Sequence, residues 1–285
     1  METSTGGSRV PPGNGDQPGS PAGPPRRRID IPTAVELVAG DDRIRCVWEN
    51  EAGGRTFELR NRSRRRFMKW APAESGIDLD REAARLAWAI RFTTVPRYID
   101  SGRDQTGTWM LTEPVLGDSA VSERWRRDPR VAVTAIGEGL RRLHEVLPVD
   151  ECPFNWSAAD RLREARQRAS LGRIDPVTWH PEHRGLTVDQ ALEELGAIPP
   201  TDQIVVCHGD ACAPNTMLSR NGRWSGHVDL GAMGVGDRWA DLAVATWSTN
   251  WNYGPGWERE LLTAYGIEPD PTRMRYYRLL WDLGP

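Results

Sequence analysis

The sequence predicts an α+β protein with two lobes: an N-terminal lobe with an antiparallel sheet and a mainly helical C-terminal lobe. Short runs of strand-forming residues between turn signals fill the first part of the chain. Longer segments with apolar residues at helical spacing follow them. The 285 residues are also enough for two modest cores, which supports two lobes.

The N-terminal segment differs in composition from everything after it. Residues 1–28 are rich in Gly, Pro and Ser, carry almost no apolar side chains and end in three arginines. Such a segment cannot bury enough surface to offset its conformational entropy, so we expect a disordered tail over 1–28. The N-terminal lobe then spans 29–115 and the C-terminal lobe spans 116–285.

Five short segments of the N-terminal lobe have the composition of strands. They cover 43–48, 56–59, 67–70, 96–100 and 108–115. Turn signals such as Gly53-Gly54 separate them. After the third, Ala83, Leu86 and Ile90 have the spacing of a buried helix face, which predicts a helix over 80–90. The lobe therefore combines an antiparallel sheet with one main helix.

Helical spacing marks the C-terminal lobe. Over 130–146, Ile136, Leu140 and Leu143 fall on one apolar stripe, and 158–170 reads as a more polar helix. A further helix is expected to begin near Arg238.

Charge and cysteine content exclude several classes of protein. The net charge of −3 argues against nucleic acid as a partner, because phosphate-backbone binding needs a basic surface. The four cysteines are scattered and form no zinc-site spacing, which suits a reducing compartment. No apolar run approaches the roughly 20 residues of a membrane helix, and no secretory signal is visible. We expect a cytoplasmic monomer that binds neither nucleic acid nor membrane.

Lys69 is the only lysine among 37 basic residues. Codon bias towards arginine explains the other positions and leaves this one to be explained. A compact ammonium fits between phosphate oxygens in a way that a planar guanidinium does not. Lys69 is therefore a candidate phosphate-binding residue.

The strongest motif runs through His208-Gly-Asp210 and Asn215 to Asp229-Leu-Gly. Phosphoryl transfer needs a carboxylate for the attacking hydroxyl, oxygen ligands for magnesium and positive charge on the phosphates. Asp210 with an asparagine five residues later has the catalytic-loop spacing of kinases, and Asp229-Leu-Gly stands where kinases bind magnesium. Each piece alone is weak, since Gly-Asp also marks ordinary turns. Together with Lys69 upstream, they predict a kinase.

With these motifs, the chain over about 31–285 resembles the aminoglycoside phosphotransferases, especially the 3′-phosphotransferases that inactivate kanamycin and neomycin. Further segments resemble that family in the same order. They are 80–88, 140–144, 152–154, 234–238, 240–243 and 277–280. The resemblance implies a protein-kinase-like fold with a five-stranded N-terminal sheet, a hinge that holds the adenine, and a helical lobe that carries the antibiotic.

The resemblance also implies a role for each motif residue. Asp210 would be the catalytic carboxylate, with Asn215 and Asp229 as Mg²⁺ ligands. Lys69 would contact the phosphates of ATP, or of GTP, with Glu82 as its ion-pair partner. His208 and Asp241 would brace the catalytic loop.

The hinge would fall over 110–117, with Thr112 and Val115 as nucleotide contacts. Pro114 lies near the position that should donate an N–H to the base, and proline has none. Either Val115 donates instead or the nucleotide preference differs. The segment 39–48 departs from the expected phosphate loop, because it lacks a serine and adds acidic charge.

Acceptor-binding residues are expected to be acidic, since an aminoglycoside is polycationic. Asp175, Glu182 and Asp282 are the candidates. Trp251 lies in an Asn-Trp-Asn segment that replaces an expected acidic turn, and is a candidate for stacking on a sugar.

The predicted reaction is transfer of the γ-phosphate of ATP to an aminoglycoside hydroxyl, the 3′-hydroxyl, which would confer antibiotic resistance. Two alternatives stay open. One is a related kinase with a different small-molecule acceptor, favoured by the thinly acidic acceptor region. The other is a catalytically silent nucleotide-binding protein, suggested by the unusual loop and Pro114. The intact set of predicted catalytic residues argues against the second.

Overall fold

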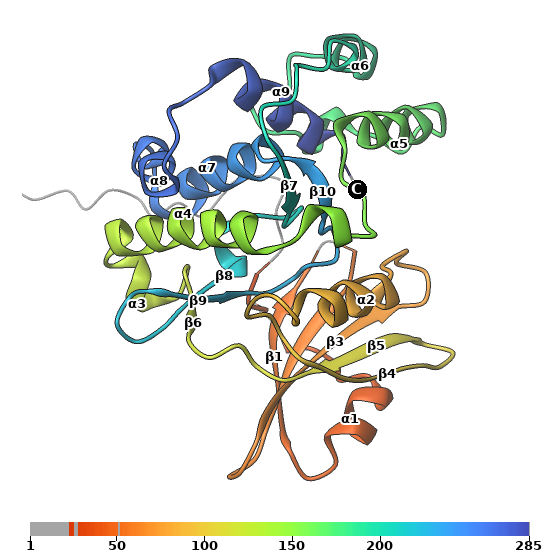
Figure 1. Cartoon of the computed structure of the whole chain (residues 1–285). Helices are drawn as coiled ribbons and strands as arrows, with labels where there is room; N and C mark the ends of the chain where they lie inside the picture. The colour runs from red at the N-terminus through yellow and green to blue at the C-terminus, as the bar shows by residue number, and fades with distance from the viewer. Residues whose placement is uncertain (1–22, 26–27, 51, 285) are drawn as a thin grey trace, which may run out of the picture.

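The N-terminal lobe is built on a five-stranded antiparallel sheet with the strand order β1-β2-β3-β5-β4 (Figure 1). The computed structural model describes residues 23–25, 28–50 and 52–284. Its sheet consists of β1 (Arg43–Glu49), β2 (Arg55–Arg60), β3 (Arg65–Pro72), β4 (Tyr98–Arg103) and β5 (Gly107–Thr112). The predicted five-stranded sheet is confirmed. Of the predicted tail, residues 1–22, 26 and 27 lie outside the described residues, and Gly23 pairs with Glu49.

The first three strands only extend beyond their predicted bounds by one or two residues, whereas the last two are displaced along the chain for local reasons. The strand predicted over 96–100 lies at 98–103, because the Asp104 carboxylate accepts from the backbone N–H of Thr106 and Gly107 and makes the turn tight. The strand predicted over 108–115 ends at Thr112, shortly before Pro114, which has no N–H for a ladder.

Two helices cover the sheet on opposite sides. Helix α2 (Leu79–Ala89) begins at Asp78, whose carboxylate accepts from Arg81 N at 2.9 Å, and its apolar face joins the main core, which continues into the C-terminal lobe. Helix α1 (Thr33–Ala39) was not predicted, since seven residues give little periodicity, and it closes a separate small core on the sheet. Figure 1 shows α2 between the sheet and the C-terminal lobe and α1 on the far side.

One of the two acidic residues in segment 39–48, Asp42, is paired with arginine inside the lobe. The segment forms the end of α1 and most of β1. Its Asp42 side chain is buried and accepts from Arg66 at 2.8 Å. The Asp42 carboxylate is therefore neutralised by arginine, whereas Asp41 is exposed.

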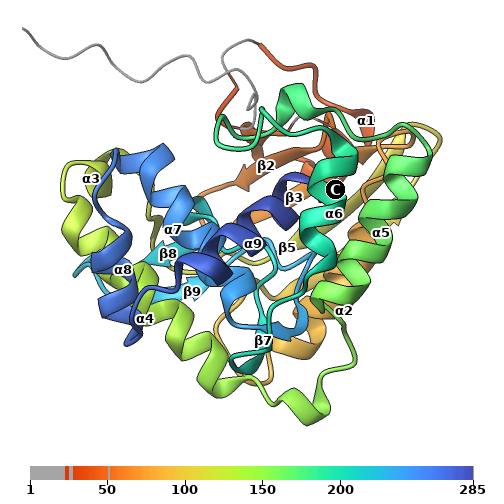
Figure 2. The same cartoon turned by 90° about the horizontal axis from the view of Figure 1, so that it is seen from above.

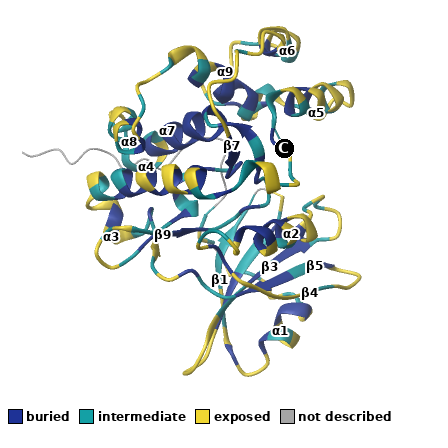
Figure 3. Ribbon diagram, in the orientation of Figure 1, coloured by how far each residue is buried: buried dark blue, intermediate teal, exposed yellow. Residues whose placement is uncertain are grey.

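The C-terminal lobe is mainly helical, as predicted. Its helices are α3 (Glu123–Arg126), α4 (Pro129–Val146), α5 (Ala158–Ser170), α6 (Val188–Gly196), α7 (Trp239–Tyr253), α8 (Glu258–Tyr265) and α9 (Pro271–Asp282). Short 3₁₀ turns lie at η1 (Val149–Glu151), η2 (Pro176–Thr178) and η3 (Ala213–Asn215). Helix α7 is buried on all sides over 239–249, as Figure 3 shows, and packs beside α9 (Figure 2). No described helix is both long and apolar enough to cross a membrane.

Two small antiparallel sheets carry the motif segments. One pairs β7 (Ile204–Cys207) with β10 (Gly234–Asp237), and the other orders β6 (Asp118–Ser119), β8 (Thr216–Leu218) and β9 (Trp224–His227). The loop from β7 to β8 and the segment that follows β9 therefore lie next to each other, between the helical lobe and the sheet (Figure 1). This arrangement brings the predicted catalytic and metal-binding residues together.

Candidate active site

The catalytic loop begins with a turn that requires glycine. Gly209 has φ +84°, which an L side chain rarely adopts. A Cβ at this position would also overlap the carbonyl oxygen of Ala232. The chain therefore passes close to the segment after Asp229, and Asp210 follows at the point where both meet.

A buried hydrogen-bond network holds this turn from behind. Asp241 on α7 accepts from the backbone N–H of His208 at 2.6 Å and of Gly209 at 2.9 Å. It also bonds His144 Nε2 at 3.0 Å, and His144 Nδ1 lies 2.8 Å from the hydroxyl of Tyr265. Burial opposes ionisation of Asp241, but the hydrogen bond and charge of His144, together with His208 and the Gly209 N–H, outweigh it and lower the pKa. The bracing role predicted for His208 and Asp241 is confirmed, while the contribution of Tyr265 was not foreseen.

Asp210 has an oxygen with no hydrogen-bond partner among the described residues. Its Oδ1 is buried and makes no hydrogen bond to any described residue. The carboxylate interacts with the Cys212 thiol, and the backbone carbonyl accepts from Asn215 Nδ2 at 3.0 Å. Burial, and then the nearby Asp229 carboxylate, raise the pKa of Asp210. A buried acceptor oxygen without a donor is suited to an incoming hydroxyl.

Lys69 lies between two carboxylates. Its Nζ is 2.7 Å from both oxygens of Glu82 on α2 and 2.8 Å from Asp229 Oδ1. Burial opposes the charge of Lys69, but the carboxylates of Asp229 and Glu82 outweigh it and raise the pKa. The Lys69 charge in turn lowers the pKa of Asp229. The structure therefore brings together the predicted phosphate-binding lysine, its partner and the predicted metal ligand.

The predicted metal ligands fit Mg²⁺ in their chemistry. Asn215 Nδ2 donates a hydrogen bond to the backbone oxygen of Asp210, which leaves the side-chain oxygen of Asn215 available to a cation. The Asp229 side chain is half exposed, holds Lys69 with one oxygen and has φ +65°. Among the described residues, no group of three His, Cys, Asp or Glu is placed to hold a metal. Two oxygen ligands that leave the other positions to water and phosphates are typical of Mg²⁺.

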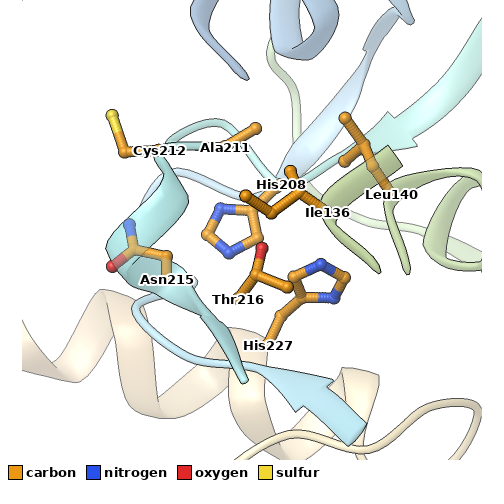
Figure 4. Close-up of a pocket in the computed structure, with 8 residues that line it drawn as sticks. All are labelled: Ile136, Leu140, His208, Ala211, Cys212, Asn215, Thr216 and His227. Carbon is orange, nitrogen blue, oxygen red and sulfur yellow. The ribbon is translucent and has the colours of Figure 1, made fainter. Parts of the chain in front are cut away.

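Behind the loop, the rings of His208 and His227 are among the side chains that line a small internal pocket (Figure 4). His208 Nε2 lies 3.0 Å from Val228 O, and the His227 ring is 5.5 Å from the His208 ring. Burial lowers the pKa of His227 well below its ordinary value. In Figure 4, Asn215 and Cys212 lie on the other side of the loop from His227. These rings support the loop and leave its outer side to the ligands.

The hinge has a free backbone donor at the predicted place, and Leu116 N and Gly117 N also have no hydrogen-bond partner among the described residues. Glu113 N donates to Arg97 O, and Leu116 O accepts from Ser225 Oγ at 2.7 Å. Val115 N has no hydrogen-bond partner among the described residues. Thr112 is buried and turns its hydroxyl towards Phe67 O at 3.5 Å. Val115 is therefore suited to donate to a base in place of Pro114.

The predicted acceptor residues divide into two groups. Asp282 at the end of α9 accepts from His183 Nδ1 at 2.6 Å and from His180 N at 3.2 Å. The Trp251 ring lies 6.4 Å from the His180 ring, so Trp251 and Asp282 meet around His180. Glu182 is exposed, 3.9 Å from His180 Nδ1. Asp175 caps η2 by accepting from Val177 N, so its carboxylate serves its own turn.

Comparison with known proteins decides the family. The sequence model of the phosphotransferase enzyme family matches residues 48–277. The chain belongs to the phosphotransferase enzyme family. This phosphotransferase is 38% identical over 247 residues to the aminoglycoside 3′-phosphotransferase of Streptomyces ribosidificus, across 82% of this chain and 92% of the relative.

Solved structures agree with this family and with the fold. The crystal structure of an aminoglycoside-3′-phosphotransferase of type VIII matches this phosphotransferase with a TM-score of 0.76 and 30% identity, over 88% of this chain and 96% of that one. An aminoglycoside phosphotransferase from Streptomyces rimosus, solved with ADP and streptomycin, matches with a TM-score of 0.67 and 27% identity, over 87% and 95%. The predicted family, fold and enzyme class are confirmed.

Two side chains near the loop were not predicted from the sequence to take part in the site. Ser248 on α7 accepts from Ala213 N at 2.8 Å, and the Cys212 thiol interacts with both Ser248 and Asp210. Burial raises the pKa of Cys212 well above its ordinary value, so the thiol stays protonated. Their signal is weak, because a serine inside an apolar helix has many ordinary explanations.

Proposed function

We propose that this phosphotransferase moves the γ-phosphate of ATP to a hydroxyl of an aminoglycoside, with Asp210 as the residue that orients and deprotonates the hydroxyl. One observation carries the proposal. The buried Asp210 Oδ1 has no partner among the described residues, and it belongs to the same cluster as the Lys69–Glu82–Asp229 ion pairs. A lone acceptor beside a phosphate-binding lysine is what transfer to an alcohol requires.

Each residue has a defined part in this reaction. The Asp210 carboxylate accepts a hydrogen bond from the acceptor hydroxyl and takes its proton as the oxygen attacks phosphorus. Lys69, held by Glu82, contacts the phosphates, and Val115 N donates to the base. Asn215 and Asp229 would hold Mg²⁺, which would neutralise charge on the phosphates. Their placement by short hydrogen bonds supplies the orientation on which phosphoryl transfer depends.

The choice of acceptor rests on the relatives. The Streptomyces ribosidificus enzyme is named an aminoglycoside 3′-phosphotransferase, which favours the 3′-hydroxyl for this chain. The added phosphate would place negative charge on the drug where it binds ribosomal RNA, and so confer resistance. ATP is the proposed donor, with GTP as a second one to be tested. We propose that the chain acts as a monomer in the cytoplasm, where ATP is present.

The test is phosphate transfer from ATP and Mg²⁺ to kanamycin, neomycin, streptomycin and a non-aminoglycoside alcohol. Asp210→Ala should lose about 10²- to 10⁴-fold in turnover, the usual contribution of a catalytic base, while nucleotide binding survives. Asp80→Ala is the matched control, because Asp80 is exposed in the first turn of α2 and its ion pair to Arg103 is 3.6 Å long.

The outcomes separate the alternatives. Asp210-dependent transfer to aminoglycosides supports the proposal. Transfer only to the other alcohol would point to a kinase with another acceptor. Nucleotide binding without any transfer would point to a silent nucleotide-binding protein.

A further inference from the structure

An aromatic surface lies beside the catalytic loop, and we define it by His180, Trp247 and Trp251. The ring centroids of His180 and Trp247 are 4.2 Å apart, and those of Trp247 and Trp251 are 5.6 Å apart. Trp247 is buried and has the guanidinium of Arg278 over its ring at 5.3 Å. Trp251 is 38% exposed, so it is the member that offers a ring to solvent.

This aromatic surface adjoins the reaction centre. Ser248, between the two tryptophans on α7, accepts from Ala213 N in the catalytic loop at 2.8 Å. Cys212 links Ser248 to the Asp210 carboxylate. Trp251 is three residues after Ser248, and side chains with that spacing are neighbours on a helix surface. Trp251 therefore lies on the helix that contacts the catalytic loop, next to the side chain that makes the contact.

The carboxylates around the aromatic surface are few or already paired. Asp282 accepts two hydrogen bonds, from His183 Nδ1 and His180 N. Asp175 holds the backbone of its own turn. Glu182 is the remaining predicted carboxylate and is exposed. Burial lowers the pKa of His180, so its ring is neutral near pH 7 and does not repel a cation.

We propose that Trp251, backed by His180, binds the acceptor by stacking against one of its cationic groups. This cation–π contact replaces the ion pair that a carboxylate would make. The inference rests on the proposed function and names its acceptor class: a glycoside that carries a cation able to lie flat on a ring. A guanidinium is the better match, since it is planar and weakly hydrated and stacks on aromatic faces. Streptomycin, which the related Streptomyces rimosus enzyme binds, is the probe with guanidinium groups, and neomycin is the probe with ammonium groups.

The experiment compares wild type, Trp251→Ala and Trp251→Phe in acceptor KM, kcat and KM for ATP, with streptomycin and neomycin. Loss of a cation–π contact should raise the acceptor KM of Trp251→Ala about 3- to 30-fold, most for streptomycin. Trp251→Phe should retain most of the affinity, and KM for ATP should stay unchanged. Tyr98→Ala is the matched control, since Tyr98 is 37% exposed on β4 in the other lobe.

A salt series separates stacking from ion pairing. Trp251→Glu should recover the neomycin binding that Trp251→Ala loses. Its KM for neomycin should rise steeply with salt, because exposed ion pairs are screened. Wild-type KM should depend on salt much less. Calorimetry of each probe with the ADP-bound protein reports binding without turnover.

Three results would overturn the inference. They are an unchanged acceptor KM in Trp251→Ala, a Trp251→Phe variant as weak as Trp251→Ala, and a Tyr98→Ala variant that is equally weakened. A wild-type protein that phosphorylates neither probe would refute the proposed function for them. If it also bound neither by calorimetry, this inference would fail as well.

Discussion

Replacing Asp241 by asparagine tests the network that holds the catalytic turn. Oδ1 accepts from Gly209 N, and Oδ2 accepts from His208 N and bonds His144 Nε2. An asparagine keeps one oxygen. If this oxygen takes the position of Oδ2, the side-chain NH2 takes the position of Oδ1 and faces the Gly209 N–H. Two buried donors then oppose each other. The two remaining bonds also lose the charge that strengthens them.

The expected cost follows from these contacts. An unsatisfied buried donor costs about 1–3 kcal/mol, and loss of charge assistance weakens the two other bonds roughly by half. Together these effects destabilise Asp241→Asn by about 3 kcal/mol of unfolding free energy. For a chain of this size, the melting temperature should fall by roughly 2 °C per kcal/mol, or about 6 °C. A shifted catalytic turn should also lower kcat by roughly 10²-fold.

The assay is thermal unfolding by circular dichroism together with steady-state kinetics on the same preparations. Asp80→Asn is the control, because the exposed Asp80–Arg103 pair should be worth less than about 1 kcal/mol. An Asp241→Asn variant that melts with wild type would show that the three bonds do not stabilise the turn. A lower melting temperature with unchanged kcat would show that they stabilise it without placing Asp210.

Three further outcomes follow from the site. Lys69→Arg should lose about 10²-fold in kcat/KM for ATP, because a guanidinium does not fit between Glu82 and Asp229 as the ammonium does. Wild-type kinetics of this variant would contradict the prediction. Gly209→Ala should melt lower and lose activity, since a left-handed residue overlapping Ala232 O costs about 1–3 kcal/mol; a stable, active variant would mean that the turn relaxes. Burial and Asp229 raise the folded-state pKa of Asp210, so stability is lost as pH rises from the ordinary aspartate value through the raised one. Asp210→Asn should therefore melt higher than wild type at neutral pH, and the gain should vanish in acid; a gain independent of pH would exclude this cause.

Much of the fold could be predicted because its signals are local. The helix over 158–170 was predicted with the bounds that the structure has. The lone lysine pointed to Lys69, and the structure places it on Glu82 and Asp229, 13 and 160 residues away in sequence. Spacing within the motifs identified the chemistry because each motif is a continuous segment.

What could not be predicted depends on contacts between distant segments. Helix α1 has only 7 residues, and its stability comes from packing that the sequence does not display. The free N–H of Val115 is visible only in the structure, where Glu113 N already donates to Arg97 O. Likewise, Asp175, Glu182 and Asp282 look alike in sequence, but one caps a turn, one is exposed and one is bound to histidine.

The single lysine also gives the chain an unusual labelling chemistry. An acylating reagent meets only one ε-amino group in the 285 residues, and that group is the one held between Glu82 and Asp229. The two carboxylates raise its pKa and so suppress the neutral amine that such reagents attack. Acylation of Lys69, read by mass spectrometry, should therefore be slow in the intact site and faster whenever the lysine leaves its partners. The extent of acylation at Lys69 would then measure how often the ion pairs of Lys69 with Glu82 and Asp229 open.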